Sequence, residues 1–184
     1  IISASPTVGR LRSVNSASSA IGVRTGASEG AVQNSGLIAV SGAAASTGVW
    51  RDNGGVLNNL AGGQILVEAT SQFVTGVEFD RGGTISNAGL IEVQRLGTAH
   101  TARAIYINAG SDPTTITNSG TIRSDDYAIY ADSTQFSPAT DGPQTITNTA
   151  TGQIIGNIML RAGNDSIANA GSITGTIDMG NFAD

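Results

Sequence analysis

Two aspartates stand at matching places in two similar segments of the chain. Asp52 belongs to Val49-Trp-Arg-Asp-Asn-Gly-Gly55, and Asp80 belongs to Val77-Glu-Phe-Asp-Arg-Gly-Gly83. If the two segments stack on one another, the two carboxyl groups become neighbours. Paired carboxylates can serve as general acid and base, or as acid and nucleophile, in the hydrolysis of a polysaccharide.

The same positions have a purely structural interpretation. An Asp in a glycine-rich turn often caps that turn by accepting hydrogen bonds from its own backbone. Arg51 and Arg81 stand beside the two acids and would screen their charge. The sequence leaves both interpretations open.

Other catalytic arrangements find little support. His100 is the single histidine, and it lies in a predicted loop, 94–103, together with Arg95 and Arg103. A serine-nucleophile triad would need a Ser and an Asp brought to this histidine. With no cysteine and one histidine, we expect no transition-metal site.

Three further acids, Asp125, Asp126 and Asp132, could hold calcium in a surface loop, but adjacent acids before a strand are more often a solvated turn. We therefore expect neither a metal ion nor another cofactor.

Composition narrows the class of partner. All nine basic residues are Arg, and the net charge is −5, which argues against nucleic acid because phosphate binding needs a basic surface. No apolar run approaches the ~20 residues that span a membrane. From the first residues, Ile1-Ile2 onward, we expect no signal peptide.

A repeated motif determines which elements would position these residues. An aliphatic residue, any residue and Asn are followed by a corner that contains Gly and then by another aliphatic residue, as in Ile116-Thr-Asn-Ser-Gly-Thr-Ile122. The motif occurs six times, and its Asn residues are 24, 29, 31, 30 and 21 positions apart: Asn34, Asn58, Asn87, Asn118, Asn148 and Asn169. A period of this length indicates a solenoid.

Each repeat contains three short segments with the alternating pattern of strands and no helical periodicity. The sequence therefore predicts an all-β fold, a right-handed parallel β-helix of about six three-strand coils. Two aliphatic ladders should fill its core, and the Asn side chains should form a third ladder at a bend. The first aliphatic ladder is Val32, Val56, Ile85, Ile116, Ile146 and Ile167; the second is Ile38, Ile65, Ile91, Ile122, Ile154 and Ile173.

Spacing between the motifs places the long excursions at two edges of the coil. Loops 41–47, 68–75 and 94–103 should cluster along one edge, and loops 108–115 and 131–145 along the other. Loops on a rigid scaffold commonly carry binding sites, although tolerated insertions would give the same pattern. The candidate ligand-binding residues are Phe73, Arg95, His100 and Arg103.

We divide the chain into residues 1–19, an N-terminal segment or partial cap, and residues 20–184, the repeat array, which we expect to be incomplete at its C-terminus. Serine-rich residues 1–19 have only scattered aliphatic residues. The last residues, from Gly175 to Gly180, begin a further coil.

Three segments of the array, ITNSGTI, ISNAGLIEV and ITNTATGQIIGNI, resemble the repeats of autotransporter passenger domains of Gram-negative bacteria. The resemblance covers roughly residues 20–184. It implies a β-helical segment of a secreted virulence protein at the bacterial surface, attached to the outer membrane through a barrel that is absent from this chain. The lack of cysteine suits a chain that crosses the outer membrane unfolded.

From this resemblance we expect a non-enzymatic adhesin or structural stalk that binds through loops on a lateral edge. Its partner would be a host-surface protein or glycan, or another copy on a neighbouring cell. The alternative is a carbohydrate-active β-helix enzyme, a hydrolase or lyase, that uses Asp52 and Asp80.

Overall fold

The computed structural model of the chain describes residues 2–4, 10–15, 19–26, 30–42, 44–70, 73–97, 101–108, 110–132 and 142–180. These residues form strands and turns, with no α-helix among them. Accordingly, none of the described segments is a helix long and apolar enough to cross a membrane. His100, one of the candidate binding residues, lies outside the described residues.

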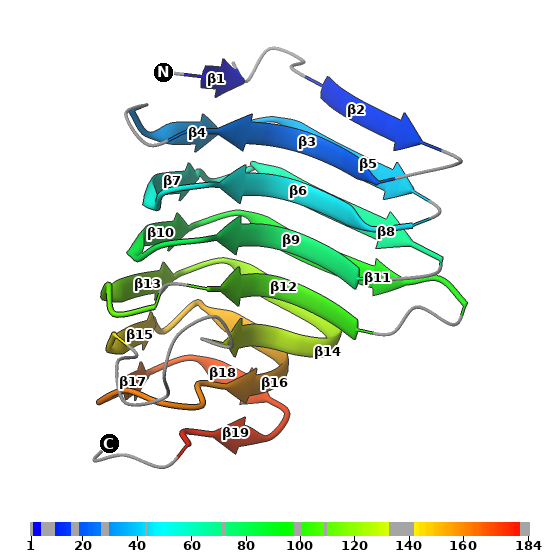
Figure 1. Cartoon of the computed structure of the whole chain (residues 1–184). Helices are drawn as coiled ribbons and strands as arrows, with labels where there is room; N and C mark the ends of the chain where they lie inside the picture. The colour runs from blue at the N-terminus through cyan, green and yellow to red at the C-terminus, as the bar shows by residue number, and fades with distance from the viewer. Residues whose placement is uncertain are drawn as a thin grey trace.

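The strands stack into a parallel β-helix with three faces (Figure 1). The side face contains β1 (Ile2–Ala4), β4 (Val32–Asn34), β7 (Gly55–Asn59), β10 (Gly83–Asn87), β13 (Thr114–Asn118), β15 (Gln144–Asn148) and β17 (Ser166–Asn169). The back face contains β2 (Arg10–Asn15), β5 (Leu37–Gly42), β8 (Gln64–Ala69), β11 (Leu90–Arg95), the start of β14 (Thr121–Ala131), the start of β16 (Gln153–Met159) and β18 (Ser172–Thr174). The front face contains β3 (Ala20–Thr25), β6 (Ser46–Arg51), β9 (Phe73–Phe79), β12 (Thr101–Ile107), the ends of β14 and β16, and β19 (Ile177–Asp178).

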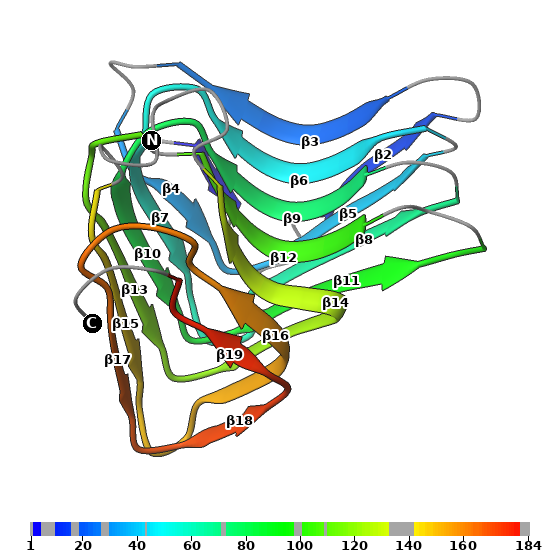
Figure 2. The same cartoon turned by 60° about the horizontal axis from the view of Figure 1, so that its bottom comes forward.

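Every pair of neighbouring strands is parallel, and each strand pairs with its counterpart in the next coil. Seen with the C-terminal end forward, the chain runs counterclockwise as it approaches the viewer (Figure 2). The winding is therefore right-handed, as the sequence predicted. The prediction of an all-β parallel β-helix is confirmed.

Aliphatic ladders fill the core. The back-face ladder has the predicted members, from Ile38 to Ile173, each in register with the next. The side-face ladder differs at one position: Leu57, not Val56, lies between Val32 and Ile85. Complete burial of each such side chain contributes about 1.5–3 kcal/mol, so the ladders account for much of the stability.

The predicted Asn ladder at the bend is wrong at one position, in the same coil as the Leu57 difference. Its members are Asn34, Asn59, Asn87, Asn118, Asn148 and Asn169; the Nδ2 of each of the first five donates to the Oδ1 of the next at 2.8 Å. Asn58 was predicted, but this copy has two adjacent Asn residues, and parallel pairing with β10 places Asn58 opposite Ser86 and Asn59 opposite Asn87. Asn59 is 1% exposed, and its amide links three coils.

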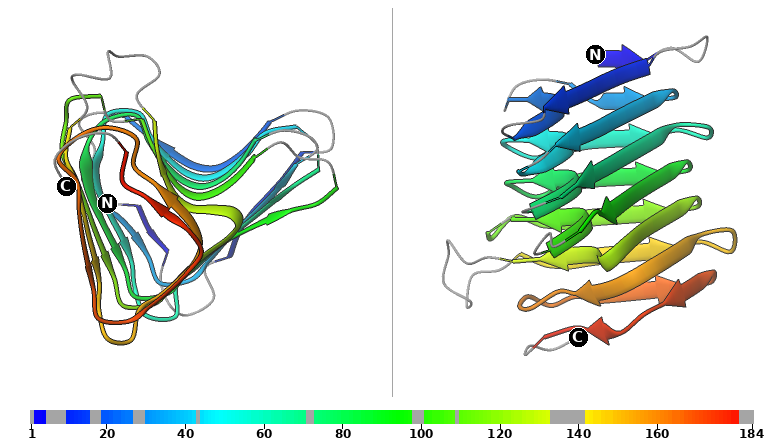
Figure 3. Two further views of the ribbon diagram at one scale, coloured as in Figure 1. Left: turned by 90° about the horizontal axis from the view of Figure 1, so that it is seen from below. Right: turned by 90° about the vertical axis from the view of Figure 1, so that its right-hand side faces the viewer.

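Small residues give the front face its concave shape, which is clear in the view along the axis (Figure 3). Gly48, Gly76, Ala104 and Ala128 occupy one column, and each is buried together with the residue that follows it. Two consecutive inward residues break the alternation of the strand and bend it toward the back face. A Cβ at Gly48 would lie 2.7 Å from the Ile65 side chain, so a larger residue could not approach as closely.

Candidate ligand-binding site

The concave front face carries rows of outward side chains that follow the axis of the β-helix. The central row is Arg24, Trp50, Glu78, Tyr106 and Tyr130, paired in register from one strand to the next. Parallel pairing fixes their separation at about 4.8 Å per coil. The rows are therefore positioned by the backbone ladder itself and not by loop conformation.

An adjoining row runs beside the central one and contains Thr47, Thr75, Arg103 and Tyr127. Together the two rows hold the single Trp and all three Tyr of a chain that is only 4% aromatic. Rings that are scarce elsewhere are thus concentrated on one surface.

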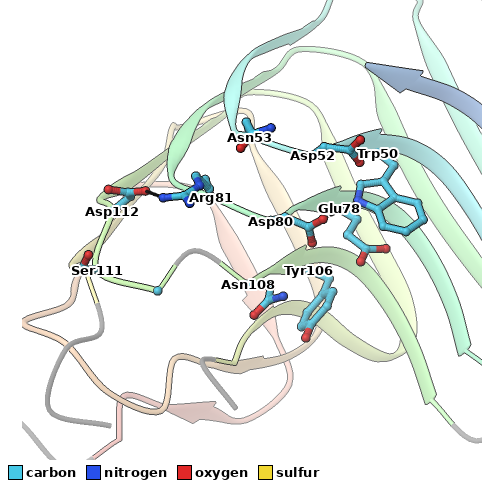
Figure 4. A pocket seen from close by; sticks show the side chains of 11 residues that line it. Trp50, Asp52, Asn53, Glu78, Asp80, Arg81, Tyr106, Asn108, Ser111 and Asp112 are labelled. Carbon is cyan, nitrogen blue, oxygen red and sulfur yellow. Dashed lines mark hydrogen bonds and ion pairs between the residues drawn. The ribbon is translucent and has the colours of Figure 1, made fainter. Parts of the chain in front are cut away.

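A third row lies where the front strands end. Asp52, Asp80, Asn108 and Asp132 each follow a front strand, and each backbone N–H donates to the strand of the preceding coil. The segments that contain Asp52 and Asp80 therefore stack, and both residues line one hollow of about 450 Å³ (Figure 4).

Both carboxylates interact with side chains of the central row. Arg24 pairs with Asp52 at 3.0 Å, and the Trp50 Nε1 donates to Asp80 at 2.8 Å. Arg51, expected to screen the acids, points into the core and is 1% exposed; its guanidinium donates to Thr25 and to the Gly54 carbonyl.

Arg81, the other expected screening residue, pairs with Asp112 at 3.5 Å. The screening of Asp52 therefore comes from Arg24, one coil away.

Glu78 is a partly buried acid of the central row. It lies between two hollows, the one that contains the aspartates and a second of about 340 Å³ that contains Phe73 and Arg103. Burial, followed by the charge of nearby Asp80, raises the pKa of Glu78 to about 7, against the opposing effects of Arg103, a Thr47 hydrogen bond and Arg24. Glu78 can therefore be neutral or charged near neutral pH.

Two of the predicted binding residues meet on this face. Phe73 and Arg103 were expected in loops, but they belong to strands β9 and β12, because the strands begin earlier than the repeat pattern indicated. The Arg103 guanidinium lies 4.9 Å from the Phe73 ring centre, 4.3 Å from Tyr106 and 4.9 Å from Tyr130.

Arg95, the third described candidate, ends strand β11 on the back face. Its guanidinium pairs with Asp126 at 2.9 Å, and its backbone N–H donates to Asp125. The Asp126 carboxylate also accepts from the backbone of Ala102. These acids hold the edge of the neighbouring coil, and the described part of the chain contains no cluster of possible metal ligands.

Sequence reasoning missed that Trp50, Glu78, Tyr106 and Tyr130 form one outward row. A signal existed: all four occupy the position after the inward aliphatic residue in the third strand of their repeats. What the sequence did not show was the bend that makes their face concave.

Fold and surface together define a class: a right-handed parallel β-helix with an aromatic, charged concave face. No protein-family model, curated protein or solved structure matches the chain.

Proposed function

We propose that this chain is a surface-exposed, non-enzymatic segment of a bacterial passenger protein and that it binds a glycan along its concave front face. The observation that carries the proposal is the in-register row of Trp50, Glu78, Tyr106 and Tyr130. Trp50 and Tyr106 are partly exposed, and such rings stack against the apolar faces of sugars. The neighbouring acids accept hydrogen bonds from sugar hydroxyl groups, and the arginines donate hydrogen bonds to them.

Two further features support this choice. The coil repeat of about 4.8 Å is close to the length of one pyranose unit in an extended chain, so successive sugars along the axis meet successive members of the central row. The repeat motifs resemble those of surface passengers, which supports an extracellular location.

Binding to the front face is tested by calorimetry after a glycan array has identified a binder. Tyr106→Ala should reduce affinity by about tenfold or more, because a stacking ring at a binding centre contributes upwards of 1 kcal/mol. Arg95→Gln, at the lateral edge, is the matched control and should bind as the unaltered chain does.

Equal losses of glycan affinity in the two variants, or a loss of affinity in Arg95→Gln alone, would favour binding at the lateral edge instead. The glycan proposal is rejected if the array contains no glycan binder and the chain instead binds a host-surface protein or self-associates on cells.

A polysaccharide hydrolase or lyase is the second candidate. It is favoured by one observation: Glu78, Asp80 and Asp52 line one hollow, and the pKa of Glu78 is raised to about 7, as a general acid requires. The test is release of new reducing ends or unsaturated products from a polysaccharide panel. Turnover that the double variant Asp52→Asn, Asp80→Asn abolishes would establish the enzyme and overturn our choice.

A further inference from the structure

Arg103 differs from the other arginines of the front face. Arg24 has an ion pair with Asp52, and Arg161 donates to the Tyr130 hydroxyl at 2.7 Å. Arg103 has no ion pair or hydrogen bond within the described part of the chain, and its Nε is buried without a partner. Its neighbours are the rings of Phe73, Tyr106 and Tyr130.

The aromatic surroundings hold the guanidinium in place without neutralising it. Ring faces attract a cation, but they leave the in-plane N–H donors free for an acceptor. A fixed guanidinium offers two parallel donors to a carboxylate, and little conformational freedom is lost on binding because the rings already restrict it. Glu78 interacts electrostatically with Arg103 but forms no ion pair with it, so the N–H donors remain available to the carboxylate of a ligand.

We propose that Arg103 is the binding site for the carboxylate of an acidic sugar, so that the ligand of the front face is a glycan with a uronic-acid unit. The proposal rests on the proposed function, since it places the acidic unit within the same glycan. Phe73, which is 49% exposed, is the ring beside Arg103 that is most open to a sugar face.

The surrounding charges indicate an acidic unit among neutral ones and not a uniform polyanion. Asp52, Asp80 and Asp132 follow one edge of the face and would repel a chain charged at every unit. Glu78 lines the same hollow as Arg103. A carboxylate on one sugar can reach the guanidinium while neutral neighbours face the acids.

The probes are hyaluronan oligosaccharides, in which glucuronate alternates with a neutral sugar, and the same oligosaccharides after reduction of the carboxyl groups to alcohols. Calorimetry on the full chain should show binding of the first set that is at least about tenfold tighter than that of the second, since charge-assisted hydrogen bonds are among the stronger ones. Arg103→Gln should remove this preference. Arg123→Gln, which removes an exposed arginine from the back face, should leave it unchanged.

The outcomes separate the inference from the proposed function. Equal binding of both probes that Tyr106→Ala weakens would retain the glycan face and overturn the carboxylate site. A preference for the acidic probe that survives Arg103→Gln would also overturn it, as would tighter binding of a sulfated neutral oligosaccharide. If neither probe binds and the array contains no front-face binder, both proposals fail.

Discussion

Two adjacent asparagines provide a direct test of the register in strand β7. The amide of Asn59 donates to the Oδ1 of Asn87 at 2.8 Å and to the carbonyls of Gly63 and Leu90, and its oxygen accepts from Asn34 at 2.8 Å. Asn58 faces outward opposite Ser86, and no side-chain hydrogen bond of Asn58 is found among the described residues.

Asn59→Ala should therefore be much more destabilising than Asn58→Ala. It removes two buried side-chain hydrogen bonds of about 1 kcal/mol each and leaves the Asn87 Oδ1 without its donor, which costs about 1–2 kcal/mol more. The expected loss of unfolding free energy is about 3 kcal/mol. Asn58→Ala should remain within about 0.5 kcal/mol, as for most surface changes.

Urea unfolding of the purified variants, followed by the circular dichroism of the β-sheet, measures both values. The two variants share composition, length and strand, so each is the control for the other. A loss of unfolding free energy in Asn58→Ala greater than that in Asn59→Ala would refute the register. Equal small losses would refute the argument that the amide ladder contributes to stability.

Three other changes test the core, the bend and the buried acid. Ile122→Ala should cost about 2–5 kcal/mol in urea unfolding, because Ile122 is fully buried and its removal leaves a cavity in the back-face ladder; a loss below about 1 kcal/mol would contradict tight packing there. Gly76→Leu should cost at least about 1–3 kcal/mol and weaken glycan binding, because even its Cβ would lie 3.0 Å from the Ile91 side chain; unchanged melting and affinity would contradict the bend argument. Burial raises the pKa of Glu78 from 4.5 to about 7, so between these pH values the folded chain retains a proton that the unfolded chain releases. The free energy of unfolding should therefore fall by about 2 kcal/mol as pH rises across this interval, after allowance for partial solvent screening. Glu78→Gln should lose this fall when unfolding is compared at about pH 5 and about pH 8, and an identical pH profile would contradict the burial of the carboxylate.

The core of this fold was largely readable from the sequence, because the corner that contains Asn and Gly keeps nearly constant length. Wherever one Asn stood in the corner, as at Asn118, both the aliphatic ladder and the amide ladder were placed correctly. The pattern failed where Asn58 and Asn59 are adjacent. Either residue satisfies the motif, and only pairing with the neighbouring coil decides between them.

The candidate site was readable only in part. Asp52 and Asp80 could be aligned because each follows its front strand by the same interval, and the segments do stack. The pKa of Glu78 could not be anticipated, since it depends on burial and on charges from three coils. Arg103 was selected as a loop residue, and its aromatic surroundings come from strands far apart in sequence.

Core and surface of this β-helix depend on the same register. The parallel pairing that stacks Val77 on Val49 inside also places Glu78 beside Trp50 outside, because successive side chains point to opposite faces of a strand. The bend at Gly76 then turns the outer row into a concave surface whose spacing the backbone fixes. A ligand that binds there meets side chains that strand pairing already holds in position, so it incurs little ordering cost. This preorganisation is the physical reason for proposing recognition on the front face.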